Sequence, residues 1–94
     1  MKAYELLYII EANTNDEKRE EIINKVKALV EENGGTAQEP EKWGVRKFAY
    51  PINYKTEGYY VLMNFEAPET VPAILESQLL ILDGIVRQMI VAKN

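Results

Sequence analysis

The segment from residue 42 to residue 55 combines cations with aromatic side chains and contains no acidic residue. Its cations are Lys42, Arg46, Lys47 and Lys55, and its aromatic residues are Trp43, Phe48, Tyr50 and Tyr54. Cations neutralise RNA phosphates, and aromatic rings stack on unpaired bases. A solvated edge strand, whose charges prevent pairing with other strands, explains the same composition. The segment alone therefore leaves RNA binding and edge protection open.

Acid–base, nucleophilic and metal chemistry have little support in the sequence. The chain has no cysteine and no histidine, which excludes disulfides, thiolate nucleophiles, Ser-His couples and nearly every transition-metal site. Six of its 15 carboxylates lie between residues 16 and 32, interspersed with lysines and an arginine, as on a solvated helix face. We therefore expect a binding protein and not an enzyme, with no metal and no cofactor.

The length and composition are those of an ordinary globular protein. The chain has 94 residues, of which 47% are apolar and 28% charged, and we expect residues 1–94 to form a single domain. The net charge of −4 does not indicate a nucleic-acid binder, although phosphate contacts depend on local patches. The sequence has no apolar run long enough to span a membrane, and its start does not resemble a signal peptide. We expect a cytoplasmic protein that does not bind membranes.

The pattern of apolar residues predicts four strands and two helices. The first strand runs from Tyr4 to Ile10, where aromatic and β-branched residues are concentrated. Thr14 and Glu17 form a capping box at the start of a helix that ends at the turn over residues 33–35. The other predicted elements are a strand over residues 36–52 with a bulge at Gly44, a hairpin loop over 53–58, a strand over 59–67, a helix opened by 68–70 and ended by 83–84, and a strand over 85–92.

This order, β-α-β-β-α-β, predicts a ferredoxin-like α+β fold: a four-stranded antiparallel sheet with two helices on one face. In the first strand, Leu6 and Tyr8 share one face, while Leu7 and Ile9 share the other. Both faces are apolar, although the helices cover only one of them. An apolar face left open marks a partner site, unless the free face simply tolerates mixed residues.

Two families with the same topology fit less well. The signature of an RNA-recognition motif matches residues 57–64 only at Gly58 and the aromatic residue that follows it. An acylphosphatase-like enzyme needs an arginine in the loop after the first strand, where this chain has residues 11–15 without one. The first family is rejected, and the second remains a distant alternative.

The string Arg-x-x-Ala-Tyr-Pro-Ile, from Arg46 to Ile52, resembles a bacterial family, small-subunit ribosomal protein number six. The wider segments 43–52, 58–61 and 83–89 fit the same family, as does the start at Tyr4, so the resemblance covers essentially the whole chain. Two features depart from it. Leu80 stands where members commonly carry an arginine, so that it and Leu82 add apolar surface, and the chain lacks the charged C-terminal tail of many members.

The resemblance implies a structural, non-enzymatic protein of the small ribosomal subunit. It implies binding to the central domain of small-subunit ribosomal RNA, together with small-subunit ribosomal protein number eighteen, the two proteins forming a heterodimer. No small-molecule substrate is expected. A self-associating regulatory or ligand-binding ferredoxin-like domain is the alternative from another class.

The candidate site residues follow from these two expected surfaces. Lys2, Arg87 and Lys93 flank the first and last strands, which are neighbours in this fold. The predicted RNA-binding residues are Lys2, Tyr4, Arg46, Lys47, Arg87 and Lys93, with Tyr4 assigned to a sugar or base and the cations to phosphates. The predicted partner-binding residues lie on the second strand, which is an edge, and on the open face: Trp43, Phe48, Tyr60, Leu62 and Met89.

Overall fold

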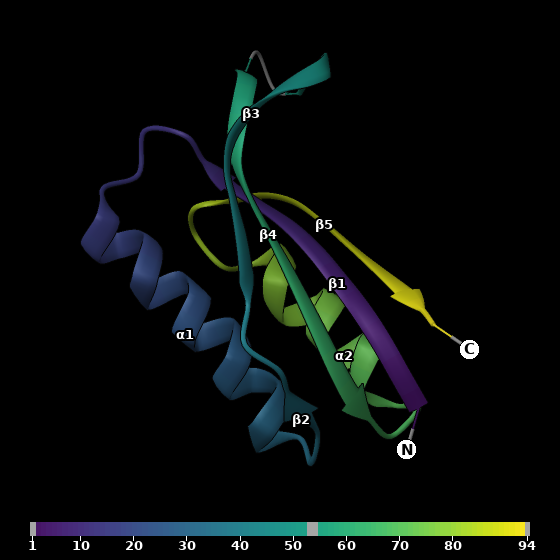
Figure 1. The fold of residues 1–94 in the computed structure, drawn as a ribbon. Helices are drawn as coiled ribbons and strands as arrows, with labels where there is room; N and C mark the ends of the chain where they lie inside the picture. The colour runs from purple at the N-terminus through teal and green to yellow at the C-terminus, as the bar shows by residue number, and fades with distance from the viewer. Residues whose placement is uncertain (1, 53–54, 94) are drawn as a thin grey trace.

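The computed structural model describes residues 2–52 and 55–93, with all side chains except those of residues 48–52 and 55–56. The described elements follow the order β1 (Lys2–Glu11), α1 (Asp16–Glu32), β2 (Thr36–Ala37), β3 (Glu41–Ile52), β4 (Lys55–Ala67), α2 (Val71–Leu80) and β5 (Ile85–Ala92). Figure 1 shows β1 running between β4 and β5 across the middle of the sheet.

The strand pairs are antiparallel, and their order confirms the predicted ferredoxin-like fold. β1 pairs with β4 on one side and with β5 on the other. The outer side of β4 pairs with β2 at one end and with β3 along the rest. The strand predicted over residues 36–52 is therefore divided in two. The chain leaves the ladder before Glu41, where Pro40 has no N–H to donate.

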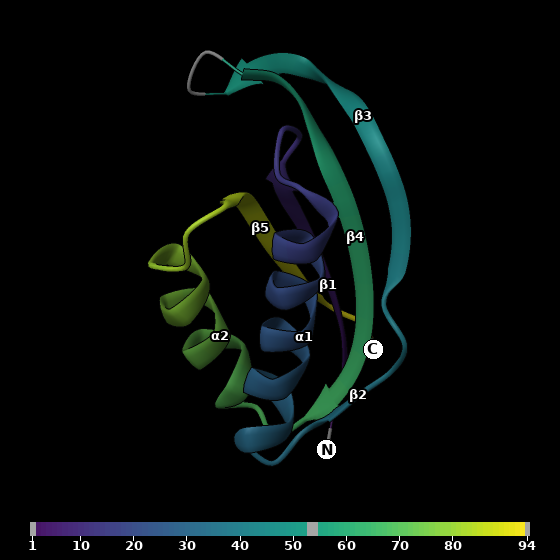
Figure 2. The same ribbon diagram turned by 90° about the vertical axis from the view of Figure 1, so that its left-hand side faces the viewer.

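The core lies between the sheet and the two helices, which cover the same face (Figure 2). Its sheet side consists of even-numbered residues of β1 and odd-numbered residues of β4, among them Leu6, Tyr8, Ile10, Val61, Met63 and Phe65. Its helix side consists of Ile22, Ile23, Val26, Val30, Val71, Leu75 and Leu79. The alternation in the strands therefore separated the two faces of the sheet as predicted, and the helices cover the face that carries Leu6 and Tyr8.

The start of α1 differs from the prediction by one residue. Asn15 is the N-cap residue, and its side-chain oxygen accepts a 2.8 Å hydrogen bond from the amide N–H of Lys18. Asparagine caps helices at least as well as threonine, so the spacing of Thr14 and Glu17 indicated the wrong cap. The helix ends as expected, with Gly34 at φ +89°, a left-handed conformation that favours glycine.

β3 and β4 form a long hairpin that passes the end of β1 and curves toward the side that carries the helices (Figure 2). The predicted loop over residues 53–58 is wrong, because β4 begins at Lys55; Asn53 and Tyr54 lie outside the described residues. Gly58 is buried within the sheet, opposite Glu11 on one side and Arg46 on the other. This glycine is thus part of the ladder, and no turn forms at it.

Tyr8 offers a test of the core. Its side chain is fully buried, and its hydroxyl has no hydrogen-bond partner among the described residues. Burial, with smaller contributions from Glu20 and Tyr59, raises the pKa of Tyr8 above its usual value, so the phenol stays neutral. We expect Tyr8→Phe to keep or raise the free energy of unfolding, by up to about 1 kcal/mol, because a buried hydroxyl without a partner is costly. Urea denaturation measures this, and a loss above about 1 kcal/mol would contradict the assignment.

Candidate partner and RNA interface

The face of the sheet opposite the helices carries six apolar side chains at its centre, here called the open face: Leu7, Ile9, Tyr60, Leu62, Met89 and Val91. The strand register places Leu7 between Leu62 and Met89. In the neighbouring row, Ile9 lies between Tyr60 and Arg87. The prediction that both faces of the sheet are apolar is therefore confirmed.

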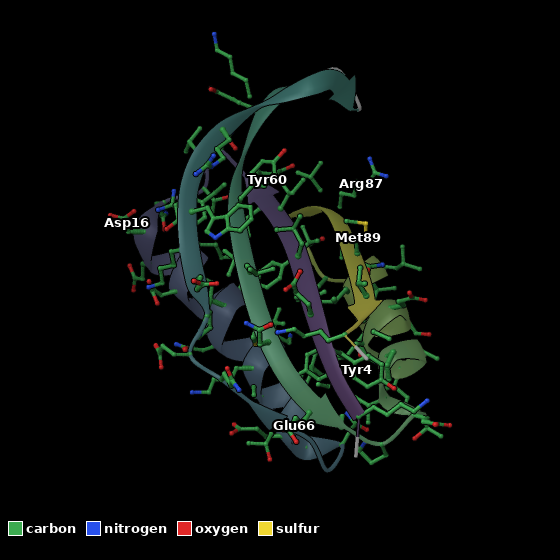
Figure 3. The ribbon with its side chains drawn as sticks, turned by 45° about the vertical axis from the view of Figure 1, so that its right-hand side comes forward. Tyr4, Asp16, Tyr60, Glu66, Arg87 and Met89 are labelled. Carbon is green, nitrogen blue, oxygen red and sulfur yellow. The ribbon has the colours of Figure 1, made fainter. Side chains whose placement is uncertain are left out.

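A depression of about 250 Å³ lies on this face, lined by Leu7, Ile9, Tyr60, Arg87, Gln88 and Met89. Figure 3 shows Tyr60 on β4, with Arg87 and Met89 across β1 on β5. Met89 and Val91 are 50% and 49% exposed, and Ile9, in the adjoining row of the same face, is 7% exposed. Apolar groups that are exposed together around a depression are typical of a surface that another protein covers.

Two arginines border the open face from opposite sides. Arg87, on β5, lies in the same cross-strand row as Ile9 and Tyr60. It has no ion-pair partner among the described residues. Arg46 lies on β3, with its guanidinium 5.4 Å from the ring centre of Trp43. The predicted bulge at Gly44 is confirmed by the register shift after Lys42 and by φ +86°. These arginines can meet phosphates at the margins of an apolar centre.

The other predicted cations are dispersed. Lys93 lies at the end of β5 and donates a 2.9 Å hydrogen bond to the side-chain oxygen of Asn64. Lys47 is exposed on β3, opposite Glu57. Lys2 forms an ion pair of 2.8 Å with Glu69. The hydrogen bond and charge of Glu69 raise the pKa of Lys2, and Lys2 lowers the pKa of Glu69 in the same way. Since Lys2 is paired with the segment before α2, the structure does not bring it to the open face.

One predicted site residue, Tyr4, is corrected by the structure, and another, Phe48, has a side chain outside the described residues. Tyr4 is only 7% exposed and belongs to the core, where its ring stacks on Phe65 at a centroid distance of 5.4 Å. Its ring is therefore not available to stack on a base, and Tyr4 leaves the set of candidates. The side chain of Phe48, predicted to bind the partner, lies outside the described residues.

One cation of the basic segment 42–55 is paired with a carboxylate on a helix and does not lie on the open face. Lys42 pairs with Glu20 of α1, and this hydrogen bond is the main reason why the pKa of Lys42 is raised. Nearby, the Arg19 guanidinium lies 4.1 Å from the ring centre of Tyr59. Both contacts join residues far apart in sequence, so the local composition does not predict them.

The end of α2 exposes apolar side chains that sequence reasoning identified only in part. Leu80 and Ile81 are 78% and 77% exposed. Leu80, the site of the departure from the family pattern, does add apolar surface, whereas Leu82 is partly buried against the core. Ile81 was missed because it follows the last residue of the helix, where helical spacing no longer indicates which way a side chain points.

The described residues contain no group of carboxylates arranged to hold a metal ion. No helix among the same residues has the length and apolar character needed to cross a membrane.

Known proteins of one family match this chain over nearly its whole length. The family model of ribosomal protein S6 matches residues 3–92. The small ribosomal subunit protein bS6 of Fusobacterium nucleatum is 45% identical over 94 residues, covering 100% of both chains. The bS6 of Caldanaerobacter subterraneus is 43% identical, covering 97% of this chain and 96% of that protein.

A solved structure resembles this fold closely. The 30S ribosomal protein S6 of Thermotoga maritima superposes with a TM-score of 0.91 at 31% sequence identity. The match covers 98% of this chain and 87% of that one. The chain therefore belongs to the ribosomal protein S6 family, whose members are proteins of the small ribosomal subunit.

Proposed function

We propose that this chain, folded as one domain, binds the central domain of small-subunit ribosomal RNA together with small-subunit ribosomal protein number eighteen. The observation that carries the proposal is the open face, an apolar surface between two arginines that do not pair with carboxylates among the described residues. The family resemblance supplies the identity of the RNA and of the partner. Membership of a ribosomal protein family makes the chain a structural component and not an enzyme, located in the cytoplasm on the ribosome.

The apolar centre of the open face is assigned to the protein partner. Leucine, isoleucine, valine and methionine side chains gain little from contact with phosphates, whereas burying them against another protein removes apolar surface from water. The partner-binding residues in this proposal are Tyr60, Leu62 and Met89 on the open face, with Trp43 at its β3 margin. Phe48 stays in the proposal on the evidence of the sequence alone.

The cations at the margins are assigned to RNA. Arg46, Arg87 and Lys93 lie on the open side of the sheet and are the first candidates for phosphate contact. Lys47, on the helix side of β3, and Lys2, paired with Glu69, stay in the proposal on the evidence of the sequence alone. With 11 basic and 15 acidic residues, the chain has few cations to offer, so the partner supplies part of the positive charge. This division of tasks predicts that RNA binding is weak without the partner.

A titration with purified protein number eighteen, followed by calorimetry and size exclusion, tests the partner assignment. We expect a one-to-one complex and a monomer when this chain is alone. A stable homodimer that ignores protein number eighteen would favour the self-associating alternative, because the same open face suits a second copy.

Arg87→Ala tests the RNA assignment. We expect RNA binding by the heterodimer to weaken by about 1 kcal/mol, with the slope of log K against log salt smaller by about 0.9, as for one lost phosphate contact. Lys25→Ala, an exposed cation on α1, is the matched control. Equal salt dependence for wild type and Arg87→Ala would remove Arg87 from the interface.

A further inference from the structure

β5 is an edge of the sheet (Figure 1). Its pairing with β1 determines which of its amides face outward. The amide N–H of Lys93 donates to the carbonyl of Ala3 at 3.0 Å. In an antiparallel ladder, alternate residues form the hydrogen-bonded pairs, so the odd-numbered residues of β5 bond to β1. The N–H and C=O groups of Gln88, Ile90 and Ala92 therefore point to the outer edge. No described strand lies there, because the order of the sheet ends at β5.

The opposite edge of the sheet is protected against further pairing, whereas this one is not. β3 has a bulge at Gly44 and three cations, Lys42, Arg46 and Lys47. From Arg87 to Ala92, by contrast, β5 keeps a regular register with β1 and contains one charged residue and no proline. Bulges and charges are the features that prevent a strand from joining an edge. Their absence here leaves a template for one more strand.

Apolar surface borders this edge on both faces of the sheet. On the open face, the half-exposed Met89 and Val91 lie next to it. On the helix side, a second depression of about 250 Å³ is lined by Leu79, Leu80, Ile85, Val86, Arg87 and Gln88. An added strand projects alternate side chains to the two faces. One row would extend the open face beside Met89, and the other would enter the depression beside Leu80.

We propose that the outer edge of β5 receives an extended segment of the protein partner, which adds a strand to the sheet through the backbone of Gln88, Ile90 and Ala92. This inference rests on the proposed function, since it gives the same partner a second contact next to the open face. Residues 85–93 contain two cations, Arg87 and Lys93, and no acid. The segment should therefore carry alternating apolar residues and a carboxylate. Two copies of β5 side by side would place four cations on one seam without an acid, which disfavours a second copy of this chain.

Amide hydrogen exchange tests the added strand directly. The probe is purified small-subunit ribosomal protein number eighteen, added to saturation to the full chain. We expect the amides of Gln88, Ile90 and Ala92 to exchange rapidly in the free chain and to slow by about 100-fold or more in the complex. The amides of Arg87, Met89 and Val91 bond to β1 in both states and serve as internal controls.

Ala92→Pro provides a second, independent readout. The amide of Ala92 points outward, so proline removes an edge donor without breaking a bond to β1. We expect the complex to be weakened by about tenfold, and Ala92→Ser, which keeps the amide, to bind as wild type. A complex in which the three outward amides stay unprotected and Ala92→Pro binds normally would overturn the added strand but leave the open-face assignment intact. Absence of any complex would overturn both. Slow exchange of these amides in the free chain would identify a second copy as the occupant and also overturn the proposal.

Discussion

Met89→Glu is expected to weaken the complex with protein number eighteen by at least about 30-fold while leaving the fold intact. Met89 is half-exposed on the open face, so a carboxylate at this position remains solvated in the free chain. In the complex the same carboxylate would lie against Leu7 and the depression beside it, without a partner charge other than Arg87. Burying a charge in an apolar interface costs roughly 2–5 kcal/mol, a loss in affinity of about 30-fold to several thousand-fold.

Val45→Glu is the matched control for this variant. Val45 is also 50% exposed, but it pairs with Tyr59 and therefore lies on the side of the sheet that carries the helices. The two variants make the same change in charge at equal exposure on opposite faces. Calorimetry should show weakened binding for Met89→Glu and retained binding for Val45→Glu. Equal affinities would show that the partner does not cover the open face.

Phe65→Ala is expected to lower the free energy of unfolding by roughly 3–5 kcal/mol, the usual cost of removing a buried aromatic ring. Phe65 is 1% exposed and stacks on Tyr4, so its loss leaves a cavity in the core between the sheet and the helices. Because small domains are stable by only about 5–15 kcal/mol, this is a large fraction of the total.

Urea denaturation measures the loss, and Phe65→Leu, which keeps most of the apolar volume, should cost clearly less. The slope of the free energy against urea should stay the same for both variants, which shows that the folded state remains compact. A loss below about 1 kcal/mol for Phe65→Ala would mean that this ring does not contribute to the core as the structure places it.

The alternation of side chains in the strands made the fold and the open face predictable. A period of two separates Leu6 and Tyr8 from Leu7 and Ile9 regardless of what the strand pairs with. Because helices can cover only one face of this sheet, the second apolar row had to be exposed or bound. The bulge at Gly44 was also predictable from local sequence, because a glycine inside a strand often marks a bulge.

Features that depend on tertiary contacts could not be predicted from the local sequence. Tyr4 was predicted to contact a sugar or base, but strand pairing places its ring over Phe65 in the core. Lys42 belongs by sequence to the basic segment 42–55, but α1 brings Glu20 to it. Gly58 looked like a turn residue, yet it sits in the ladder because β3 and β4 continue past β1. In each case a partner distant in sequence overrides the local signal.

The central claim is that the open face needs a protein partner before the chain binds RNA tightly. The most direct measurement is a titration of labelled central-domain RNA with this chain, with and without protein number eighteen, at about 50 mM and 200 mM salt. Tight, salt-sensitive binding that arises only with the partner present is the predicted result. Binding of equal strength with and without the partner would contradict the claim, and so would the absence of binding under every condition.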